Sequence, residues 1–335
     1  MPRAVGVCYG TSGNVPNPRE VVELLKRHNI GKVRILEADD HDRVEALRAL
    51  EKTGIEEVIV GLRNEELEKV ASNQAAANGW VRDNVGAYYP AANIKYISVG
   101  NKVLHHKNEK YVSHLLPAVR NIQTALRKAN LDKDIKVSTT QAASSVLAGA
   151  GDSNYDPRPS QGEFRNDLKS TLRPLLRFLA DNGSPFMVNV YPYFTYPGNR
   201  DQVSLDYALF NPSAPVVHDG GLQYRNLFDA TVDYVIAALE REGHPRLPLL
   251  ITESGWPSAG DDGVATVDNA RAYNNNLIRH VSSNQGTPRR PGNPIHAYIF
   301  SLFNHNTVSG PDVQRHFGLF YPNKTPVYPV DFSPY

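Results

Sequence analysis

The feature that most constrains this chain is a repeated alternation between short apolar runs and longer amphipathic segments. The runs are rich in β-branched and aromatic side chains and are bounded by Gly, Asn or Pro, a pattern typical of buried strands. They occupy residues 5–8, 33–36, 58–61, 94–100, 135–138, 186–191, 249–252 and 297–302. The chain is therefore expected to contain eight buried strands.

The segments between these runs have helical periodicity. In "PREVVELLKRHN", Val21, Val22, Leu24 and Leu25 fall on one helical face, and Pro18 suits the first turn of a helix. The segments 111–130, 227–243 and 267–283 follow the same pattern. Strands that alternate with helices predict parallel βα units, whose sheet is covered by helices.

Eight βα units without a dividing linker predict one closed architecture. We expect residues 1–335 to form a single domain of the α/β class, a (β/α)₈ TIM barrel. A doubly wound nucleotide-binding sheet would need a glycine-rich phosphate loop after the first strand, and "CYGTSGNVP" lacks that spacing. Two irregular segments, 149–162 and 193–221, follow the fifth and sixth strands and are expected to shape the C-terminal mouth of the barrel.

Composition and charge narrow the classes of partner. The formal net charge is +1, which gives no overall attraction to nucleic acid or to an anionic membrane, and no apolar run is long enough to span a bilayer. The single cysteine, Cys8, excludes an internal disulfide and is expected to be a buried core thiol. No cofactor or metal is expected. The first residues lack a hydrophobic signal region, which fits a cytosolic chain or a mature form.

Polar and aromatic residues gather where the predicted strands end. In a barrel of this kind, functional side chains lie at the C-terminal ends of the strands. Aromatic rings that stack on sugar faces, next to amides that bind hydroxyl groups, are the pattern of a carbohydrate site. The candidates for substrate binding are Tyr9, Asn101, Asn189, Tyr191, Tyr193, Phe194, Trp256, Phe303 and His305. Glu253, in "LLITESGWPSAG", is the candidate carboxylate, since an apolar strand leads directly into it.

Several motifs resemble one known family. "GVCYG", "NIKYISVGN", "LLPAVRN", "NVYPYF", "NLFDATVD", "TESGWPSAG" and "FGLFYPNKTPVYP" occur in the order found in plant endo-1,3-β-glucanases of glycoside hydrolase family 17. The resemblance runs from about Val5 to Phe332. It implies a (β/α)₈ barrel, retaining cleavage of 1,3-β-glucan, and a monomeric plant defence or cell-wall protein that is secreted, extracellular or vacuolar.

The same resemblance implies two catalytic positions, and this chain departs from the family at one of them. It places the nucleophile at Glu253 and the acid/base group directly after Asn101, where the family has Glu and this chain has Lys102. Retaining hydrolysis uses two carboxyl groups about 5–5.5 Å apart. Further departures occur at Leu36, His305, Val308 and Gln314.

Three functions remain open on this sequence. The first is a pseudoenzyme that binds β-glucan, because a Lys102–Glu253 ion pair would keep Lys102 charged and unable to donate a proton as the acid does. The second is an active glucan endo-1,3-β-glucosidase with a substitute acid, for which Glu37 is the candidate. The third is a protein-binding or inhibitor barrel with an idle cleft. His105, His106 and Lys107, with Lys102, would make the mouth basic and suited to an anionic glycan.

Overall fold

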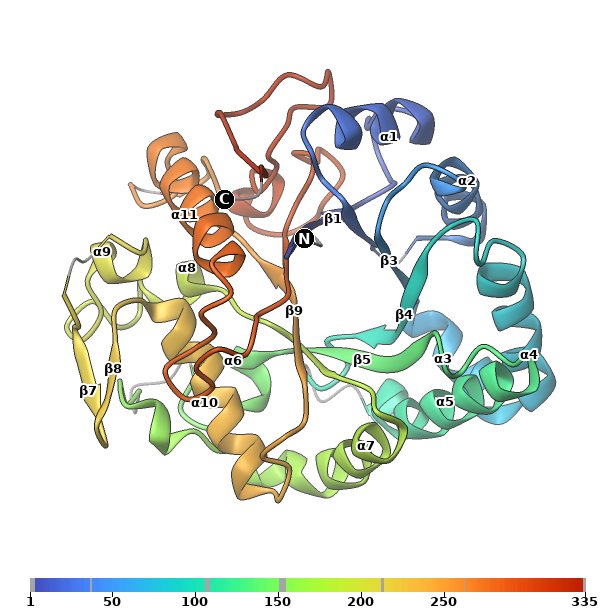
Figure 1. Ribbon diagram of the computed structural model, residues 1–335, viewed down its shortest axis with the longest axis horizontal. Helices are drawn as coiled ribbons and strands as arrows, with labels where there is room; N and C mark the ends of the chain where they lie inside the picture. The colour runs from blue at the N-terminus through green and yellow to red at the C-terminus, as the bar shows by residue number, and fades with distance from the viewer. Residues whose placement is uncertain are drawn as a thin grey trace.

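The computed structural model describes residues 4–36, 38–105, 109–150, 155–211, 214–261 and 263–333. Eight parallel strands form a closed barrel in the order β1-β10-β9-β6-β5-β4-β3-β2. Helices lie around the outside of the strands (Figure 1). The predicted (β/α)₈ barrel is therefore confirmed.

The barrel strands coincide with the eight predicted runs, with ends that differ by a few residues. They are β1 (Val5–Tyr9), β2 (Lys32–Ile35), β3 (Glu57–Leu62), β4 (Ile94–Asn101), β5 (Lys136–Ala142), β6 (Phe186–Asn189), β9 (Leu249–Ser254) and β10 (Ala297–Ile299). A two-stranded antiparallel hairpin, β7 (Val217–Asp219) and β8 (Leu222–Tyr224), stands apart from the barrel. This hairpin was not predicted, because its strands are short and interrupt a long loop.

A side-chain cap marks the start of α1, α2, α4, α9, α10 and α11. Asn17 accepts from the backbone N–H groups of Arg19 and Glu20 at the start of α1, where Pro18 is the first helical residue. The helices are α1 (Pro18–Arg27), α2 (Asp40–Leu50), α3 (Leu67–Ser72), α4 (Gln74–Val81), α5 (Glu109–Lys128), α6 (Ala143–Val146), α7 (Lys169–Asn182), α8 (Pro192–Thr195), α9 (Leu205–Ala208), α10 (Leu227–Arg241) and α11 (Val267–Ser282). None of those among the described residues is long and apolar enough to cross a membrane.

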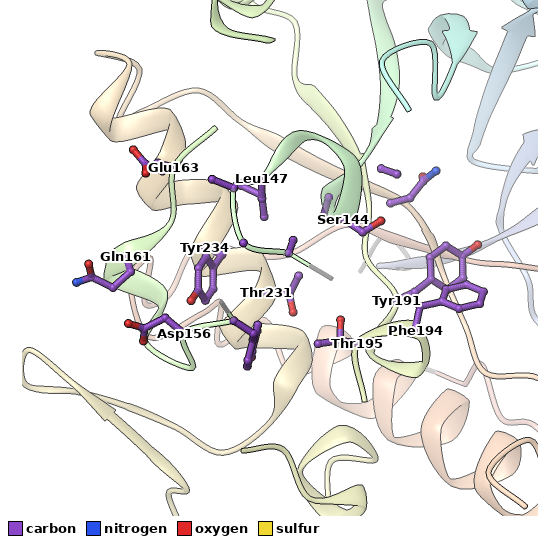
Figure 2. Close-up of a pocket in the computed structure, with 17 residues that line it drawn as sticks. Ser144, Leu147, Asp156, Gln161, Glu163, Tyr191, Phe194, Thr195, Thr231 and Tyr234 are labelled. Carbon is purple, nitrogen blue, oxygen red and sulfur yellow. The ribbon is translucent and has the colours of Figure 1, made fainter. Parts of the chain in front are cut away.

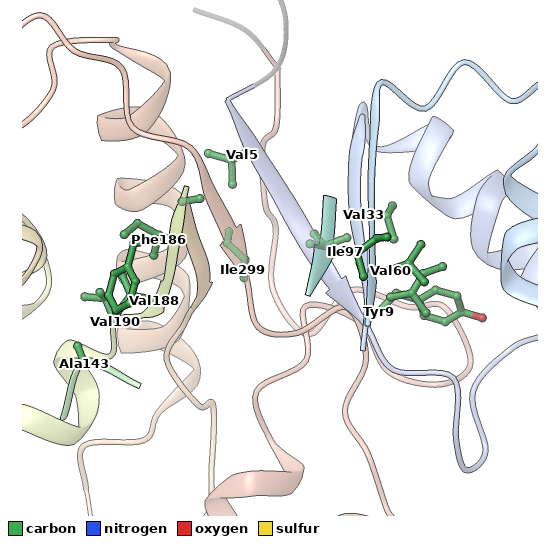
Figure 3. Close-up of a cluster of buried hydrophobic side chains, with 14 of the residues drawn as sticks. Val5, Tyr9, Val33, Val60, Ile97, Ala143, Phe186, Val188, Val190 and Ile299 are labelled. Carbon is green, nitrogen blue, oxygen red and sulfur yellow. The ribbon is translucent and has the colours of Figure 1, made fainter. Parts of the chain in front are cut away.

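The core has two layers that follow from the alternation of side chains along each strand. One set of strand residues packs outward against the helices, and Val33, Val188 and Ile299 belong to it (Figure 3). The other set fills the barrel and includes Cys8 and Met187. Cys8 has no exposed surface, and its Sγ lies 3.2 Å from the Thr252 carbonyl oxygen, so the predicted core thiol is confirmed.

Candidate functional site

Glu253 is the centre of a buried polar cluster at the C-terminal end of β9. Its Oε1 lies 2.8 Å from Arg34 Nη1, and its Oε2 lies 3.3 Å from Lys102 Nζ. Tyr191 donates its hydroxyl to the same Oε2 at 2.7 Å. These partners come from β2, from the end of β4 and from the residues after β6, so closure of the barrel brings them to one carboxylate.

The surroundings of Glu253 favour its charged form. Burial alone would raise the pKa of Glu253, but the positive charges of Lys102 and Arg34 and the hydrogen bond from Tyr191 outweigh it and lower the pKa from 4.5 to about 2. Burial and the adjacent carboxylate raise the pKa of Tyr191 well above its ordinary value. The cluster therefore contains two cations, one carboxylate and one neutral phenol at neutral pH.

The backbone at the end of β4 holds Lys102 in an uncommon conformation. Lys102 has a φ of 53°, in the left-handed region that side chains disfavour. Its N–H donates to the Thr140 carbonyl at 2.8 Å. The neighbouring Asn101 donates its N–H to Asn64 Oδ1 at 2.8 Å and accepts from Asn64 Nδ2 at 3.0 Å through its carbonyl. These bonds fix the corner from both sides and direct Lys102 toward Glu253.

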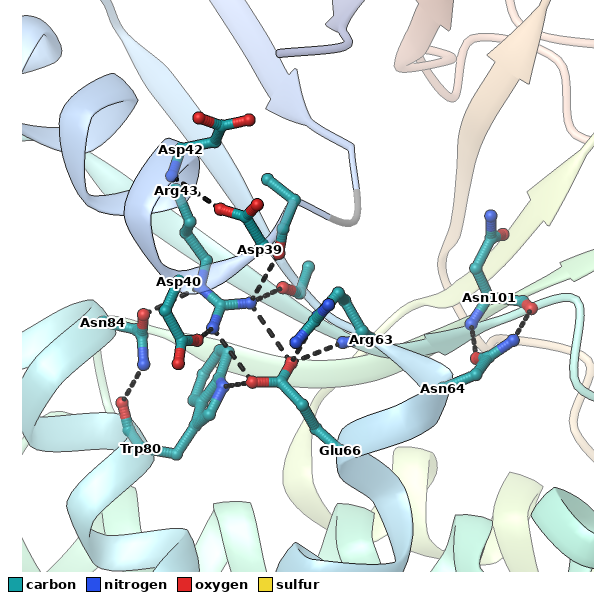
Figure 4. Close-up of polar contacts among 12 residues, drawn as sticks. Asp39, Asp40, Asp42, Arg43, Arg63, Asn64, Glu66, Trp80, Asn84 and Asn101 are labelled. Atoms are coloured by element: carbon teal, nitrogen blue, oxygen red, sulfur yellow. Dashed lines mark hydrogen bonds and ion pairs between the residues drawn. The ribbon is translucent and has the colours of Figure 1, made fainter. Parts of the chain in front are cut away.

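The turn that carries Asn64 is fixed in its own right by a buried arginine. Arg43, on α2, has no exposed surface and donates to Glu66 at 3.0 and 3.2 Å and to Asn84 at 2.7 Å. Glu66 also accepts from the Trp80 indole N–H at 3.2 Å. Figure 4 shows this network beside the Asn64–Asn101 pair. The short 3₁₀ turn Asn64–Glu66 thus links the outer helices to the corner at Lys102.

Asn189 ends β6 in the wall of the barrel, where it is 2 % exposed. Its Oδ1 accepts from Thr252 Oγ1 at 2.8 Å. Its buried Nδ2 has no hydrogen-bond partner among the described residues. A buried amide donor without a partner is costly, and a ligand oxygen could satisfy it.

The aromatic residues after β6 and β9 separate into exposed and buried groups. Phe194 is 45 % exposed, whereas Tyr193 is 5 % exposed and Trp256 is completely buried. Trp256 donates its indole N–H to the Val264 carbonyl at 3.0 Å, and the Tyr193 hydroxyl donates to Asp261. The prediction that Tyr193 and Trp256 stack on a sugar needs an exposed ring face, and the structure gives them none. Asp261 and Val264 of the loop after β9 hold these two side chains, so both rings pack inside the protein.

The same correction applies to residues at β1 and after β10. Tyr9 and Phe303 are 3 % and 1 % exposed, so both rings belong to the core. His305 is also buried, and burial lowers its pKa, so it adds no positive charge to the mouth at neutral pH. His105 is hydrogen-bonded to Ser145 through its Nδ1. Glu37, His106 and Lys107 lie outside the described residues.

A cavity of about 350 Å³ opens beside the Glu253 cluster. Tyr191 belongs to both the cluster and the cavity, because its hydroxyl contacts Glu253 and Tyr191 is one of the residues that line the cavity. Figure 2 shows Tyr191 and Phe194 at one end of the cavity and Asp156, Gln161 and Glu163 at the other. The two segments predicted to shape the mouth both contribute, since Tyr155 and Thr195 also line the cavity.

Sequence reasoning missed Arg34 and Asn64 as parts of this site. A signal for Arg34 was available, because a charged residue inside the apolar run "KVRI" has to find a buried partner. Asn64 carried no such signal, since an Asn after a strand is ordinary turn chemistry. Among the described residues no group of three or more His, Cys, Asp or Glu side chains could hold a metal ion.

The chain is similar throughout its length to known proteins. The family model described as glycosyl hydrolases family 17 matches residues 5–332. A glucan endo-1,3-beta-glucosidase of Vitis vinifera is 43 % identical over 333 residues, 99 % of this chain and 92 % of the relative. The basic vacuolar isoform GLB of the same enzyme from Nicotiana tabacum is 46 % identical, over 99 % of this chain and 85 % of the relative.

A solved structure is similar in fold as well as in sequence. CJP38, a beta-1,3-glucanase and allergen of Cryptomeria japonica pollen, superposes with a TM-score of 0.91 at 54 % identity, covering 98 % of this chain and 99 % of that one. The family match, the relatives and the superposition agree with the resemblance carried by the motifs. The chain therefore belongs to glycosyl hydrolase family 17.

Proposed function

We propose that this barrel binds a β-1,3-glucan or a related oligosaccharide at the C-terminal mouth, and that its hydrolysis of such a glucan is impaired or lost. The observation that carries the proposal is the ion pair between Lys102 Nζ and Glu253 Oε2 at 3.3 Å. On the family resemblance, we assign the nucleophile position to Glu253 and the acid/base position to Lys102.

Lysine at position 102 cannot act as the general acid. The leaving sugar oxygen needs a proton as the glycosidic bond breaks, and general acid catalysis of this kind contributes roughly 10²–10⁴ in rate. An ammonium group is a far weaker acid than the carboxylic acid that the family uses, so it transfers a proton poorly to a sugar oxygen. The ion pair with Lys102, together with Arg34 at 2.8 Å, keeps Glu253 ionised.

Glucan binding is supported by two groups at the mouth of the barrel that are available to a sugar. Phe194 exposes 45 % of its surface, so its ring face is available to a sugar. The unpartnered Nδ2 of Asn189 is a donor ready for a hydroxyl oxygen. We propose that Asn101 and Tyr191 complete this surface and that the protein is a single-domain monomer. We also propose that it is vacuolar or secreted; the tobacco relative is named as a vacuolar isoform.

The first experiment is a product analysis. The protein is incubated with laminaripentaose at near-stoichiometric ratio for a long period, and the mixture is analysed by mass spectrometry. We expect intact pentaose. Shorter oligomers that disappear in the Glu253→Gln variant would overturn the proposal in favour of an active glucan endo-1,3-β-glucosidase, the activity named for the relatives.

Two further variants assign the cause and the binding surface. Lys102→Glu is expected to restore pentaose cleavage, while the matched charge reversal Lys110→Glu, on exposed α5, restores none. Phe194→Ala is expected to weaken pentaose binding several-fold in calorimetry, because the variant lacks the exposed ring face on which a sugar would stack. Unchanged binding in this variant would overturn the role given to Phe194. No binding by the unaltered protein would favour a barrel that recognises a protein or an anionic glycan.

A further inference from the structure

We infer that this site cleaves β-glucosides whose leaving group departs as a stable anion, a phenolate or a carboxylate, and that the cavity beside Tyr191 holds the apolar aglycone. The inference rests on the proposed function in one respect, the assignment of Lys102 to the acid/base position. It goes beyond that function because it gives the altered site a substrate class of its own.

The chemistry follows from what an ammonium can and cannot do. A sugar alkoxide is too basic to leave without a proton, whereas a substituted phenolate or a carboxylate leaves unprotonated. For such groups the missing acid costs little, and a cation next to the departing oxygen stabilises the charge that develops on it. Lys102 can supply this cation. Its side chain contacts the buried carboxylate of Glu253 and is 38 % exposed at the mouth, so a leaving group that enters from the mouth can reach it.

The bond changes balance without a co-reactant other than water. A Glu253 carboxylate oxygen forms a bond to the anomeric carbon, and the bond from that carbon to the aglycone oxygen breaks with its electron pair, releasing the phenolate or carboxylate. Water then attacks the anomeric carbon, the bond to Glu253 breaks, and the proton from water passes to solvent. The second step lacks a general base, so we expect it to be the slower one.

The cavity has the composition of a site for an apolar group rather than for a polysaccharide. Ten of its seventeen described lining residues are Ala, Gly, Leu, Phe or Tyr. The end next to Glu253 is aromatic, with Tyr191 and Phe194, and the carboxylates Asp156 and Glu163 lie at the far end (Figure 2). A volume of about 350 Å³ lies within the range of small-molecule pockets, about 300–1,000 Å³.

The cavity also lies on the correct side of Glu253 for an aglycone. In the barrel, β9 is followed by β6, β5 and β4, and the cavity is lined from the ends of β6 and β5. The corner at Lys102 is joined to this wall by the bond from Lys102 N–H to Thr140 and by that from His105 to Ser145. The group at the acid/base position and the cavity therefore share one side of the carboxylate.

Two activated substrates with leaving groups of different size test the inference. The first is 2,4-dinitrophenyl β-laminaribioside, whose leaving group would enter the cavity, and the second is β-laminaribiosyl fluoride, whose leaving group needs no cavity. With each we expect a burst of leaving group equal to the protein concentration, followed by slow turnover. Azide, which needs no base to attack, is expected to speed turnover by at least about tenfold. Glu253→Gln is expected to abolish both bursts.

A variant that fills the cavity tests whether the cavity binds the aglycone, independently of the catalytic role of Glu253. Ser144 lines the cavity and is exposed, so Ser144→Leu is expected to fold normally and to lower kcat/KM for the dinitrophenyl substrate at least about tenfold, with no change for the fluoride. Ser113→Leu, an exposed site on α5, is the matched control.

The outcomes are distinct for the two proposals. No burst with either substrate overturns the present inference and leaves glucan binding untouched. An equal loss on both substrates in Ser144→Leu overturns the assignment of the cavity. Cleavage of laminaripentaose by the unaltered protein overturns the proposed function, whatever the activated substrates do.

Discussion

Replacement of Glu253 by glutamine is expected to destabilise the fold in a manner that depends on pH. The change keeps the shape of the side chain and removes its charge, so Arg34, which has no exposed surface, loses its ionic partner. Removing one member of a buried ion pair costs about 3–5 kcal/mol in free energy of unfolding. Lys102 is 38 % exposed, so solvent screens its loss and it adds less. We expect a cost of about 3–5 kcal/mol at pH 7.

The pH dependence follows from the lowered pKa of Glu253. A carboxylate whose pKa is about 2 in the folded chain and 4.5 when unperturbed contributes stability that is fully present above pH 4.5 and is lost as the pH falls toward 2. At pH 3 the loss is about one and a half pKa units, or about 2 kcal/mol. The difference between the two proteins should therefore shrink by about 2 kcal/mol between pH 7 and pH 3.

Urea unfolding followed by circular dichroism at both pH values provides the test. Glu45→Gln, which disrupts the exposed pair between Glu45 and Arg48, serves as the control and should change the free energy of unfolding by less than about 0.5 kcal/mol at pH 7. A Glu253→Gln cost below about 1 kcal/mol, or one equal at pH 7 and pH 3, would refute the electrostatic account of this cluster.

Three other changes probe the supports of the site. Arg43→Lys should lower the thermal midpoint clearly, because lysine cannot reproduce the fork of bonds to Glu66 and Asn84, while Arg48→Lys on the exposed face of α2 should not. Asn64→Ala should cost about 1–3 kcal/mol in urea unfolding, since both backbone groups of Asn101 lose their partner; a neutral result would contradict a clamped corner. Gly318→Ala should cost about 1–3 kcal/mol or more, because a Cβ there would lie 1.9 Å from the Asn304 nitrogen, whereas Gly198→Ala meets nothing within 4 Å and should be tolerated; equal midpoints would refute the packing argument.

The sequence predicted the scaffold more fully than the placement of its aromatic rings. The eight barrel strands and the helix start at Pro18 were predictable because burial imposes a period of two or 3.6 residues on local sequence. Trp256 and Tyr193 follow strands as the predicted sugar-binding residues do, yet loops distant in sequence cover them. A local pattern cannot tell whether a later segment will fold over a ring.

Contacts between distant segments explain the other omissions. The bond between Arg34 and Glu253 joins residues 219 positions apart, and barrel closure alone brings them together. The cavity is lined from β5, β6 and α10, so its size depends on how three βα units pack. The resemblance placed Glu253 and Lys102 at adjoining corners because it supplied a known three-dimensional arrangement that composition and periodicity do not contain.

The corner at Lys102 has a consequence for protein engineering. The hydrogen bonds described there reach the backbone of residues 101 and 102, and none of them depends on which side chain residue 102 carries. The backbone conformation of this corner should therefore stay the same when the side chain at position 102 is replaced. Glutamate, histidine, cysteine or a noncanonical amino acid introduced at this one position would be presented to Glu253 from the same starting geometry, so a series of such variants could compare catalytic groups in a constant frame.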